Sequence, residues 1–303
     1  MILNRIFRLL HTIFLYMSRV LAVPDVHGNK IALENAKVAY EKYKPDFVIF
    51  VGDYVDSHAE GNSWIQQQEQ LNAILDWKKE LNKEKEVCFT LFGNHDLSYM
   101  YNYGGLKCSG HQFFVSQDIQ EFFCEHWNEF QAIKVVDNWI FSHAGVTQQW
   151  LDFPLGGNFA KEPIDGENQY WTLDDVNRHF RDKDLKYFNH NSYDPYGDDE
   201  HEGCMWIRPP ALIKAGLEGY NQCVGHTVLD LNDKEYMDYW RLEGRVVNAR
   251  DWYDKELILL QLQQKLDDCP RNLDRKYVFI DHPENKVCAI IDTKTNEVEI
   301  IGE

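Results

Sequence analysis

The segment that decides the fold is Phe47–Asp56, with the sequence FVIFVGDYVD. Its first half, Phe47–Val51, is an unbroken run of β-branched and aromatic residues, which predicts a strand buried on both faces. The run stops at Gly52 and is followed by two carboxylates, Asp53 and Asp56. In open α/β sheets, ligands bind in the crevice beyond the carboxyl ends of the strands. Asp53 is therefore the first candidate for a functional residue.

Length and charge narrow the classes of protein to which the chain can belong. With 303 residues it is long enough for one large α/β domain, and nothing in its composition demands two. The formal net charge is −18 at pH 7. Such a surface repels a nucleic-acid backbone, so no stable nucleic-acid binding is expected. A small anionic substrate would need a locally positive pocket, which a metal site can supply.

Cysteine usage and the N-terminus bear on the cellular compartment. The 7 cysteines are odd in number and nowhere form a C-x-x-C pair, which is typical of reduced thiols in a cytoplasmic protein. The apolar segment 1–16 is too short and too interrupted to span a bilayer, and no small-x-small cleavage site precedes the first strand. We interpret it as an N-terminal extension, either a loosely attached amphipathic helix or residues upstream of a natural start at Met17. Residues 17–303 are expected to form a single domain without a membrane span.

Four other apolar runs end as Phe47–Val51 does, with glycine, proline or serine and then polar residues. Because the carboxyl ends of parallel strands lie on the same edge of a sheet, this recurrence predicts one shared site. A helix expected at 29–43 makes the first two strands a βαβ unit. The polar residues that follow the runs are Asp25 and His27 after 19–23, Asn94 and His95 after 87–92, His143 after 139–142, and His226 after 222–224.

The remaining segments complete the expected organisation. Periodicity is lost between about 150 and 205, which we interpret as a partly helical insertion that covers the site. A mostly helical segment is expected at 97–127 and an amphipathic helix at 249–266. The chain is expected to close with antiparallel strands at 277–281, 287–292 and 298–301.

The strand ends offer a mixed set of oxygen and imidazole donors. The set has too few thiols for a structural zinc site and too many histidines for a calcium site, and it suits two transition-metal ions that share a bridging carboxylate. Metals about 3.5–4 Å apart lower the pKa of a shared water and clamp the attacking and leaving oxygens of a displacement. Phosphate-ester hydrolysis is the chemistry that most needs this arrangement. The set consists of Asp25, His27, Asp53, Asp56, Asn94, His95, His143 and His226.

Five blocks of the sequence resemble the calcineurin-like metallophosphoesterase superfamily, in the order that the family shows. The resemblance implies an α/β fold with a layered α+β arrangement, in which helices flank a central mixed β-sandwich. It places the site at the carboxyl ends of the strands. It also implies a metal-dependent phosphatase. The blocks are Asp25-x-His27, Gly52-Asp53 with Asp56 downstream, Gly93-Asn94-His95, His143-Ala144-Gly145 and Gly225-His226.

The resemblance gives each of these residues an expected role. His95 is not a metal ligand but the general acid that protonates the leaving oxygen, and Asp56 orients it. A carboxylate partner raises the pKa of an imidazole and fixes its tautomer. Manganese is the first candidate for the two divalent ions, with iron and zinc as alternatives, since all three suit these ligands. The implied ligands are Asp25 and His27 for the first ion, Asp53 as the bridge, and Asn94, His143 and His226 for the second.

The closest blocks point to two substrate classes. Gly52–Asp56 looks like the protein serine/threonine phosphatases, whereas Gly93–Leu97 and His143–Trp150 look more like the symmetrical dinucleoside-tetraphosphate hydrolases. Ser57 stands where the phosphatases have an arginine. We therefore take Arg208 as the candidate for gripping the phosphoryl oxygens, because a guanidinium can bind two of them at once.

Three hypotheses about function follow. The first is a phosphoesterase with two metal ions that hydrolyses phosphomonoesters, either of small molecules or of phosphoproteins. The alternative is hydrolysis of dinucleoside polyphosphates or other nucleotides. The third is a module that binds phosphorylated ligands without catalysis, which only the missing arginine suggests.

Overall fold

The computed structural model describes residues 18–57, 62–101, 107–154, 170–189, 199–227, 246–248, 275–281 and 287–302. The N-terminal extension (1–16) and the helix expected at 249–266 lie outside these ranges, as do large parts of the insertion expected at 150–205. Within the described residues, no helix is both long enough and apolar enough to cross a membrane.

The strands form two mixed sheets. In the first sheet the order is β11, β10, β1, β2, β3, β4; neighbours among β1 to β4 are parallel, and β10 is antiparallel to both β1 and β11. Its strands are β1 (Arg19–Val23), β2 (Phe47–Phe50), β3 (Cys88–Leu91), β4 (Phe130–Gln131), β10 (Val287–Asp292) and β11 (Glu297–Gly302).

The second sheet has the order β5, β6, β7, β9, β8. Only β5 and β6 are antiparallel, and the other neighbours are parallel. Its strands are β5 (Ile133–Val136), β6 (Trp139–Ser142), β7 (Asn221–Val224), β8 (Val246–Asn248) and β9 (Tyr277–Phe279).

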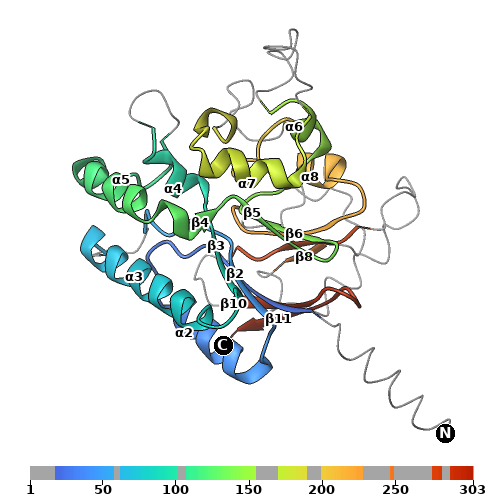
Figure 1. Ribbon diagram of the computed structural model, residues 1–303, viewed down its shortest axis with the longest axis horizontal. Coiled ribbons are helices and arrows are strands. Elements are labelled where there is room, and N and C mark those ends of the chain that lie inside the picture. The colour runs from blue at the N-terminus through green and yellow to red at the C-terminus, as the bar shows by residue number, and fades with distance from the viewer. Residues whose placement is uncertain are drawn as a thin grey trace, which may run out of the picture.

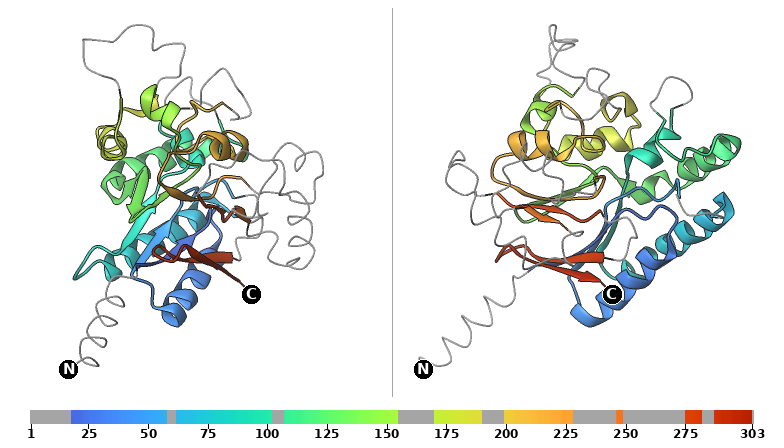
Figure 2. Two further views of the ribbon diagram at one scale, coloured as in Figure 1. Left: turned by 90° about the vertical axis from the view of Figure 1, so that its right-hand side faces the viewer. Right: turned by 180° about the vertical axis from the view of Figure 1, so that it is seen from behind.

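Helices cover both outer faces of this sandwich (Figure 1). α2 and α3 lie along the first sheet, and α6, α7 and α8 lie on the side of the second sheet; Figure 2 shows the same layers from two other directions. This arrangement confirms the predicted layered α/β fold. The helices are α2 (Lys30–Tyr43), α3 (Trp64–Leu81), α4 (Asn94–Ser98), α5 (Ser116–Glu125), α6 (Gln148–Asp152), α7 (Leu173–Arg181) and α8 (Pro209–Ala215).

The position of β2 in the fold explains why its sequence contains no polar residue. Side chains alternate between the two faces of a strand, and both faces of β2 are buried. Ile49 belongs to the cluster between the two sheets, together with Phe141 of β6. Phe50 points to the other face and meets Trp77 of α3, with ring centroids 6.2 Å apart. The expectation of a strand buried on both faces is thus confirmed.

Local sequence signals set the ends of the helices. The Asn29 side chain caps α2 by accepting a hydrogen bond from the backbone N–H of Ile31 (3.0 Å). Ser63 and Gln66 form a capping box at the start of α3. These two helices connect β1 to β2 and β2 to β3, so the start of each helix fixes where a loop of the candidate site ends.

One expectation about organisation needs correction. Residues 277–279 (β9) pair in parallel with β7 and β8, not antiparallel to the end of the chain. The segment 97–127, expected to be mostly helical, contains the end of α4 and all of α5, with residues 107–112 between them. Helix α7 lies in the expected insertion, and its Phe180 is fully buried and stacks on Trp127, with ring centroids 4.3 Å apart.

Candidate metal centre

The carboxyl ends of β1, β2, β3, β6 and β7 meet at one edge of the sandwich. Parallel pairing aligns β1 with β2 and β3 in one sheet, and β6 with β7 in the other. Contacts between the loops join the two sheets: His143 Nδ1 lies 3.1 Å from the Val51 carbonyl oxygen, and the His226 backbone N–H donates to Asp25 (3.0 Å). All eight residues of the predicted donor set therefore lie around one point.

Several of these residues have left-handed backbone conformations. The φ angles are 44° for His27, 50° for Asp53, 63° for Asp56 and 64° for His226. For residues other than glycine such conformations cost about 1–3 kcal/mol each and concentrate at functional sites. Backbone hydrogen bonds hold the turns in place: the Asp53 carbonyl accepts from the N–H groups of Val26 (2.9 Å) and His27 (2.7 Å).

Two glycines make room for the carboxylates. A Cβ atom on Gly93 would lie 2.1 Å from Asp53 Oδ1, and one on Gly225 would lie 1.9 Å from Asp25 Oδ1. Neither position can carry a side chain without moving a carboxylate of the site. The glycines that precede Asn94 and His226 in the sequence blocks are thus required by close packing rather than by chain flexibility.

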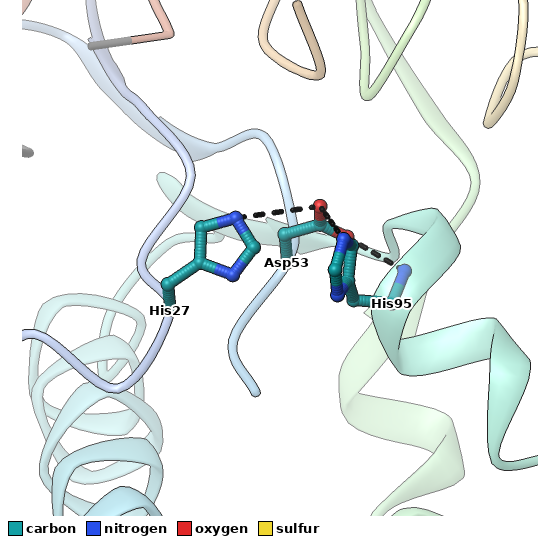
Figure 3. A group of neighbouring side chains, drawn as sticks. All are labelled: His27, Asp53 and His95. Carbon is teal, nitrogen blue, oxygen red and sulfur yellow. Dashed lines mark hydrogen bonds and ion pairs between the residues drawn. The ribbon is translucent and has the colours of Figure 1, made fainter. Parts of the chain in front are cut away.

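Asp53 lies at the centre of the donor set. Its Oδ2 atom is 3.3 Å from His143 Nε2, 3.8 Å from His27 Nε2 and 3.9 Å from His95 Nε2. Figure 3 shows the rings of His27, from a loop, and His95, from helix α4, on either side of this carboxylate. Two triplets have ligand atoms within 4.8 Å of one another, namely His27, Asp53 and His95, and Asp25, Asp53 and His143. Both triplets contain Asp53.

The ligands predicted for the second ion, Asn94, His143 and His226, also lie close together. Asn94 Oδ1 lies 2.7 Å from His143 Nε2 and 3.2 Å from His226 Nδ1. The rings of the two histidines are 5.0 Å apart. An amide oxygen and two imidazoles in this arrangement are ligands that suit a divalent transition metal.

One buried atom shows that the donor set fits a cation. Asp25 is 1% exposed, and its Oδ1 atom has no hydrogen-bond partner among the described residues. A buried polar atom without a partner is costly. A divalent cation beside Asp25 would supply the missing partner, so the residues present fit the metal that their chemistry implies.

The charges of the site are unevenly distributed. Burial raises the pKa of Asp25 well above its usual range, and the nearby Asp281 and Asp53 carboxylates raise it further. Burial also acts to raise the pKa of Asp53, but His143 and His95 outweigh it and hold that pKa well below its usual range. These shifts favour the ionised form of Asp53, whereas burial favours the neutral form of Asp25.

His95 and Asp56 form a separate buried pair. His95 Nδ1 lies 3.0 Å from Asp56 Oδ2, and Asp56 is fully buried. Burial lowers the pKa of His95, but the Asp53 and Asp56 carboxylates outweigh it and raise the pKa to about 9. An imidazole in this setting holds a proton at neutral pH and presents its Nε2 atom to the centre of the site.

Arg208 lies at the edge of this group. It is the N-cap residue of α8 and is partly buried. Burial, followed by the charges of His143 and Arg208, holds the pKa of His226 well below its usual range. The guanidinium is thus close enough to act on the site electrostatically, but it is not among the donors that surround Asp53.

Two carboxylates of the site were missed from the sequence. Asp96 is fully buried and accepts from the backbone N–H groups of Tyr54 (2.8 Å) and Gly93 (3.0 Å), so it joins the loops after β2 and β3. Asp281 follows β9, and its carboxylate raises the pKa of Asp25. Asp281 could have been found from the sequence, because it is another carboxylate that follows an apolar run. That run, 277–281, was expected to be one of the antiparallel strands that close the chain.

Comparisons with known structures agree with this fold. A cold-active protein-tyrosine phosphatase of the psychrophile Shewanella sp. is similar to the chain with a TM-score of 0.51 and 14% identity, over 94% of this chain and 80% of that one. A protein serine/threonine phosphatase from Saccharomyces cerevisiae, described as similar to human phosphatase PP5, has a TM-score of 0.36 and 16% identity, over 70% of this chain and 62% of that one. At 14% identity the first likeness shows the fold alone, and the second, with its lower TM-score, supports no conclusion.

Sequence comparison identifies the family. A search of curated proteins found no match. The sequence model described as calcineurin-like phosphoesterase matches residues 18–230, which is more than half of the chain and includes all of the donor set described above. The chain therefore belongs to the calcineurin-like phosphoesterase family and is a metal-dependent phosphoric ester hydrolase.

Proposed function

We propose that this protein hydrolyses phosphomonoesters, with phosphoproteins as one candidate class of substrate, and that it uses two divalent metal ions held around Asp53. The position of Asp53 Oδ2 carries the proposal, because it lies within 3.9 Å of imidazole nitrogens from two loops and from helix α4. The residues proposed to hold the ions are Asp25 and His27 for the first, Asn94, His143 and His226 for the second, and Asp53 for both.

The metal ions, when bound, supply a water of lowered pKa and positive charge for the phosphoryl oxygens. Manganese is the first candidate, and iron and zinc suit the same ligands. The protein itself provides the orientation. The His95 backbone N–H donates to Asp53 Oδ1 (2.9 Å), which leaves Oδ2 to face the histidines.

His95 is proposed as the general acid rather than as a ligand. Its Nδ1 atom is engaged by Asp56, so the proton available for transfer is the one on Nε2, which faces the site. Phosphomonoester hydrolysis needs a proton for the leaving oxygen when that oxygen is a poor leaving group. A histidine that lies beside Asp53 could also serve as a ligand, so the metal content of a His95 variant separates the two roles.

Arg208 is proposed to bind the phosphoryl group. Among the described residues no ion pair is found for its guanidinium, although its charge reaches His226. A planar guanidinium with free donors can bind two oxygens of one phosphoryl group. It would compensate for Ser57, which stands where related phosphatases have an arginine.

Hydrolysis of dinucleoside polyphosphates is the second candidate. It is supported by the match of Gly93–Leu97 and His143–Trp150 to the symmetrical dinucleoside-tetraphosphate hydrolases. The buried Asp56 beside His95 favours the first candidate, because those hydrolases tend to lack this carboxylate. The neighbour described as a protein-tyrosine phosphatase is a reason to include phosphotyrosine peptides among the test substrates.

A substrate panel tests the proposed reaction. We expect manganese-dependent release of phosphate from p-nitrophenyl phosphate and from at least one phosphopeptide, lost with EDTA and restored by manganese. The Asp53→Asn variant should be inactive but folded, because it removes the charge shared by the two ions. Faster turnover of diadenosine tetraphosphate than of every monoester would favour the second candidate. A purified protein with two metal ions bound and no activity on any ester would refute both.

The role of His95 predicts a dependence on the leaving group. We expect His95→Ala to lower kcat on phenyl phosphate by about 100-fold to 10,000-fold, since that is the range of general acid catalysis. On 2,4-dinitrophenyl phosphate the loss should be much smaller, because this leaving group departs without a proton. Metal content, measured by mass spectrometry, should not change, and His126→Ala, which alters a histidine outside the site, should have no effect. Equal losses on the two esters would rule out the acid role.

The role of Arg208 predicts a loss of substrate binding. We expect Arg208→Ala to lower kcat/KM by about 10-fold to 100-fold, in line with a loss of about 1.5–3 kcal/mol for hydrogen bonds to a charged group. Arg208→Lys should recover only part of it, because an ammonium cannot bind two oxygens in one plane. Arg178→Ala, which removes an exposed guanidinium on α7, is the control. Unchanged kcat/KM in Arg208→Ala would assign the phosphoryl contact to another residue.

A further inference from the structure

We propose that Tyr99 is a positioning residue for His95, and that it acts by fixing the carboxylate of Asp56. The inference rests on the proposed role of His95 as general acid. It concerns a residue that no motif of the sequence marks, and that contacts Asp56 rather than a residue proposed to hold a metal ion.

Tyr99 and His95 hold the two oxygens of one carboxylate. The Tyr99 hydroxyl donates to Asp56 Oδ1, and His95 Nδ1 lies 3.0 Å from Asp56 Oδ2. His95 lies within α4 and Tyr99 is its C-cap residue, four positions later. Residues four apart lie on the same face of a helix. Asp56 is thus held by two side chains that extend from one face of one short helix.

The direction of the Tyr99 hydrogen bond is fixed by a second contact. The backbone N–H of Gln112 donates to the Tyr99 hydroxyl oxygen (2.7 Å). A hydroxyl has one proton to donate and can accept with its lone pairs. Because Gln112 uses an acceptor position, the hydroxyl proton remains for Asp56, which as a carboxylate can only accept.

Packing keeps the phenol ring in place. Tyr99 is 1% exposed, and its ring stacks on that of His111 with centroids 4.2 Å apart. His111 is itself held beside Ser98 Oγ, at 3.2 Å from Nδ1. The Gln112 side chain donates to the buried Gln67 (3.1 Å). The hydroxyl therefore has little freedom to turn away from Asp56.

This geometry explains how Tyr99 would affect the chemistry. Asp56 is completely buried, so water cannot replace a lost donor to Oδ1. Without the hydroxyl, His95 Nδ1–H is the donor to this carboxylate that remains among the described residues. The carboxylate can then turn so that its two oxygens share this donor, and the imidazole loses its fixed orientation. The Nε2 proton would no longer be aimed at the leaving oxygen.

The test is Tyr99→Phe, which removes only the hydroxyl. We expect kcat on phenyl phosphate to fall by about 10-fold to 100-fold, by analogy with the loss seen when a residue that orients a metal-binding histidine is changed. KM and metal content should not change, and turnover of 2,4-dinitrophenyl phosphate should fall much less. The control is Tyr101→Phe, which removes a hydroxyl that donates to the Leu185 carbonyl (2.8 Å) and should leave both esters unaffected.

A spectroscopic measurement gives a readout that does not depend on turnover. In zinc-loaded protein with ¹⁵N-labelled histidine, the Nδ1–H proton of His95 should give a downfield signal, assigned by its loss in His95→Ala. We expect this signal to move upfield and to exchange faster with water in Tyr99→Phe, but not in Tyr101→Phe. A signal that is the same in Tyr99→Phe and the wild type would overturn the proposal.

The two variants also separate this inference from the function on which it rests. If His95→Ala loses activity selectively on phenyl phosphate and Tyr99→Phe loses equally on both esters or on neither, Tyr99 is only structural and the function stands. If His95→Ala itself shows equal losses, the acid role is wrong, and the positioning role of Tyr99 is rejected with it.

Discussion

The structure depends on the burial of one carboxylate, that of Asp53, between two sheets. An ionised group that is 2% exposed would be strongly destabilising if it were alone. Here the imidazoles of His27, His95 and His143 and a backbone N–H group surround it. These partners follow the ends of β1 and β3 in one sheet and of β6 in the other. The sandwich must therefore bring its strand ends together for the charge to be tolerated, and in doing so it assembles the donors for a metal centre.

The same constraint divides the site into two parts. Around Asp53, one oxygen is held by the backbone and the other is left to face nitrogen and oxygen donors. The second buried carboxylate, Asp56, has its own partners, His95 and Tyr99, and is not among the groups that could hold a metal. In the proposed function the first part binds cations and the second controls a proton, although both include residues of the short helix α4. His95 is the residue through which they meet.

Much of this could be predicted from the sequence because the site follows a simple rule: polar residues come directly after buried parallel strands. The rule located Asp25, Asp53 and His226 without any knowledge of distances. It failed for β9, since residues 225–276 separate that strand from β7 in the sequence and hide their parallel pairing. Tyr99 carries no such signal. Its role depends on its spacing of four from His95 and on the backbone of Gln112, which only the folded chain brings near.

We propose above all that two metal ions share the Asp53 carboxylate. The most direct measurement is anomalous X-ray diffraction from crystals grown with manganese, recorded at the manganese absorption edge. We expect two peaks on either side of the Asp53 carboxylate, one beside Asp25 and His27 and the other beside Asn94, His143 and His226. A single peak, or two peaks that Asp53 does not separate, would contradict the account.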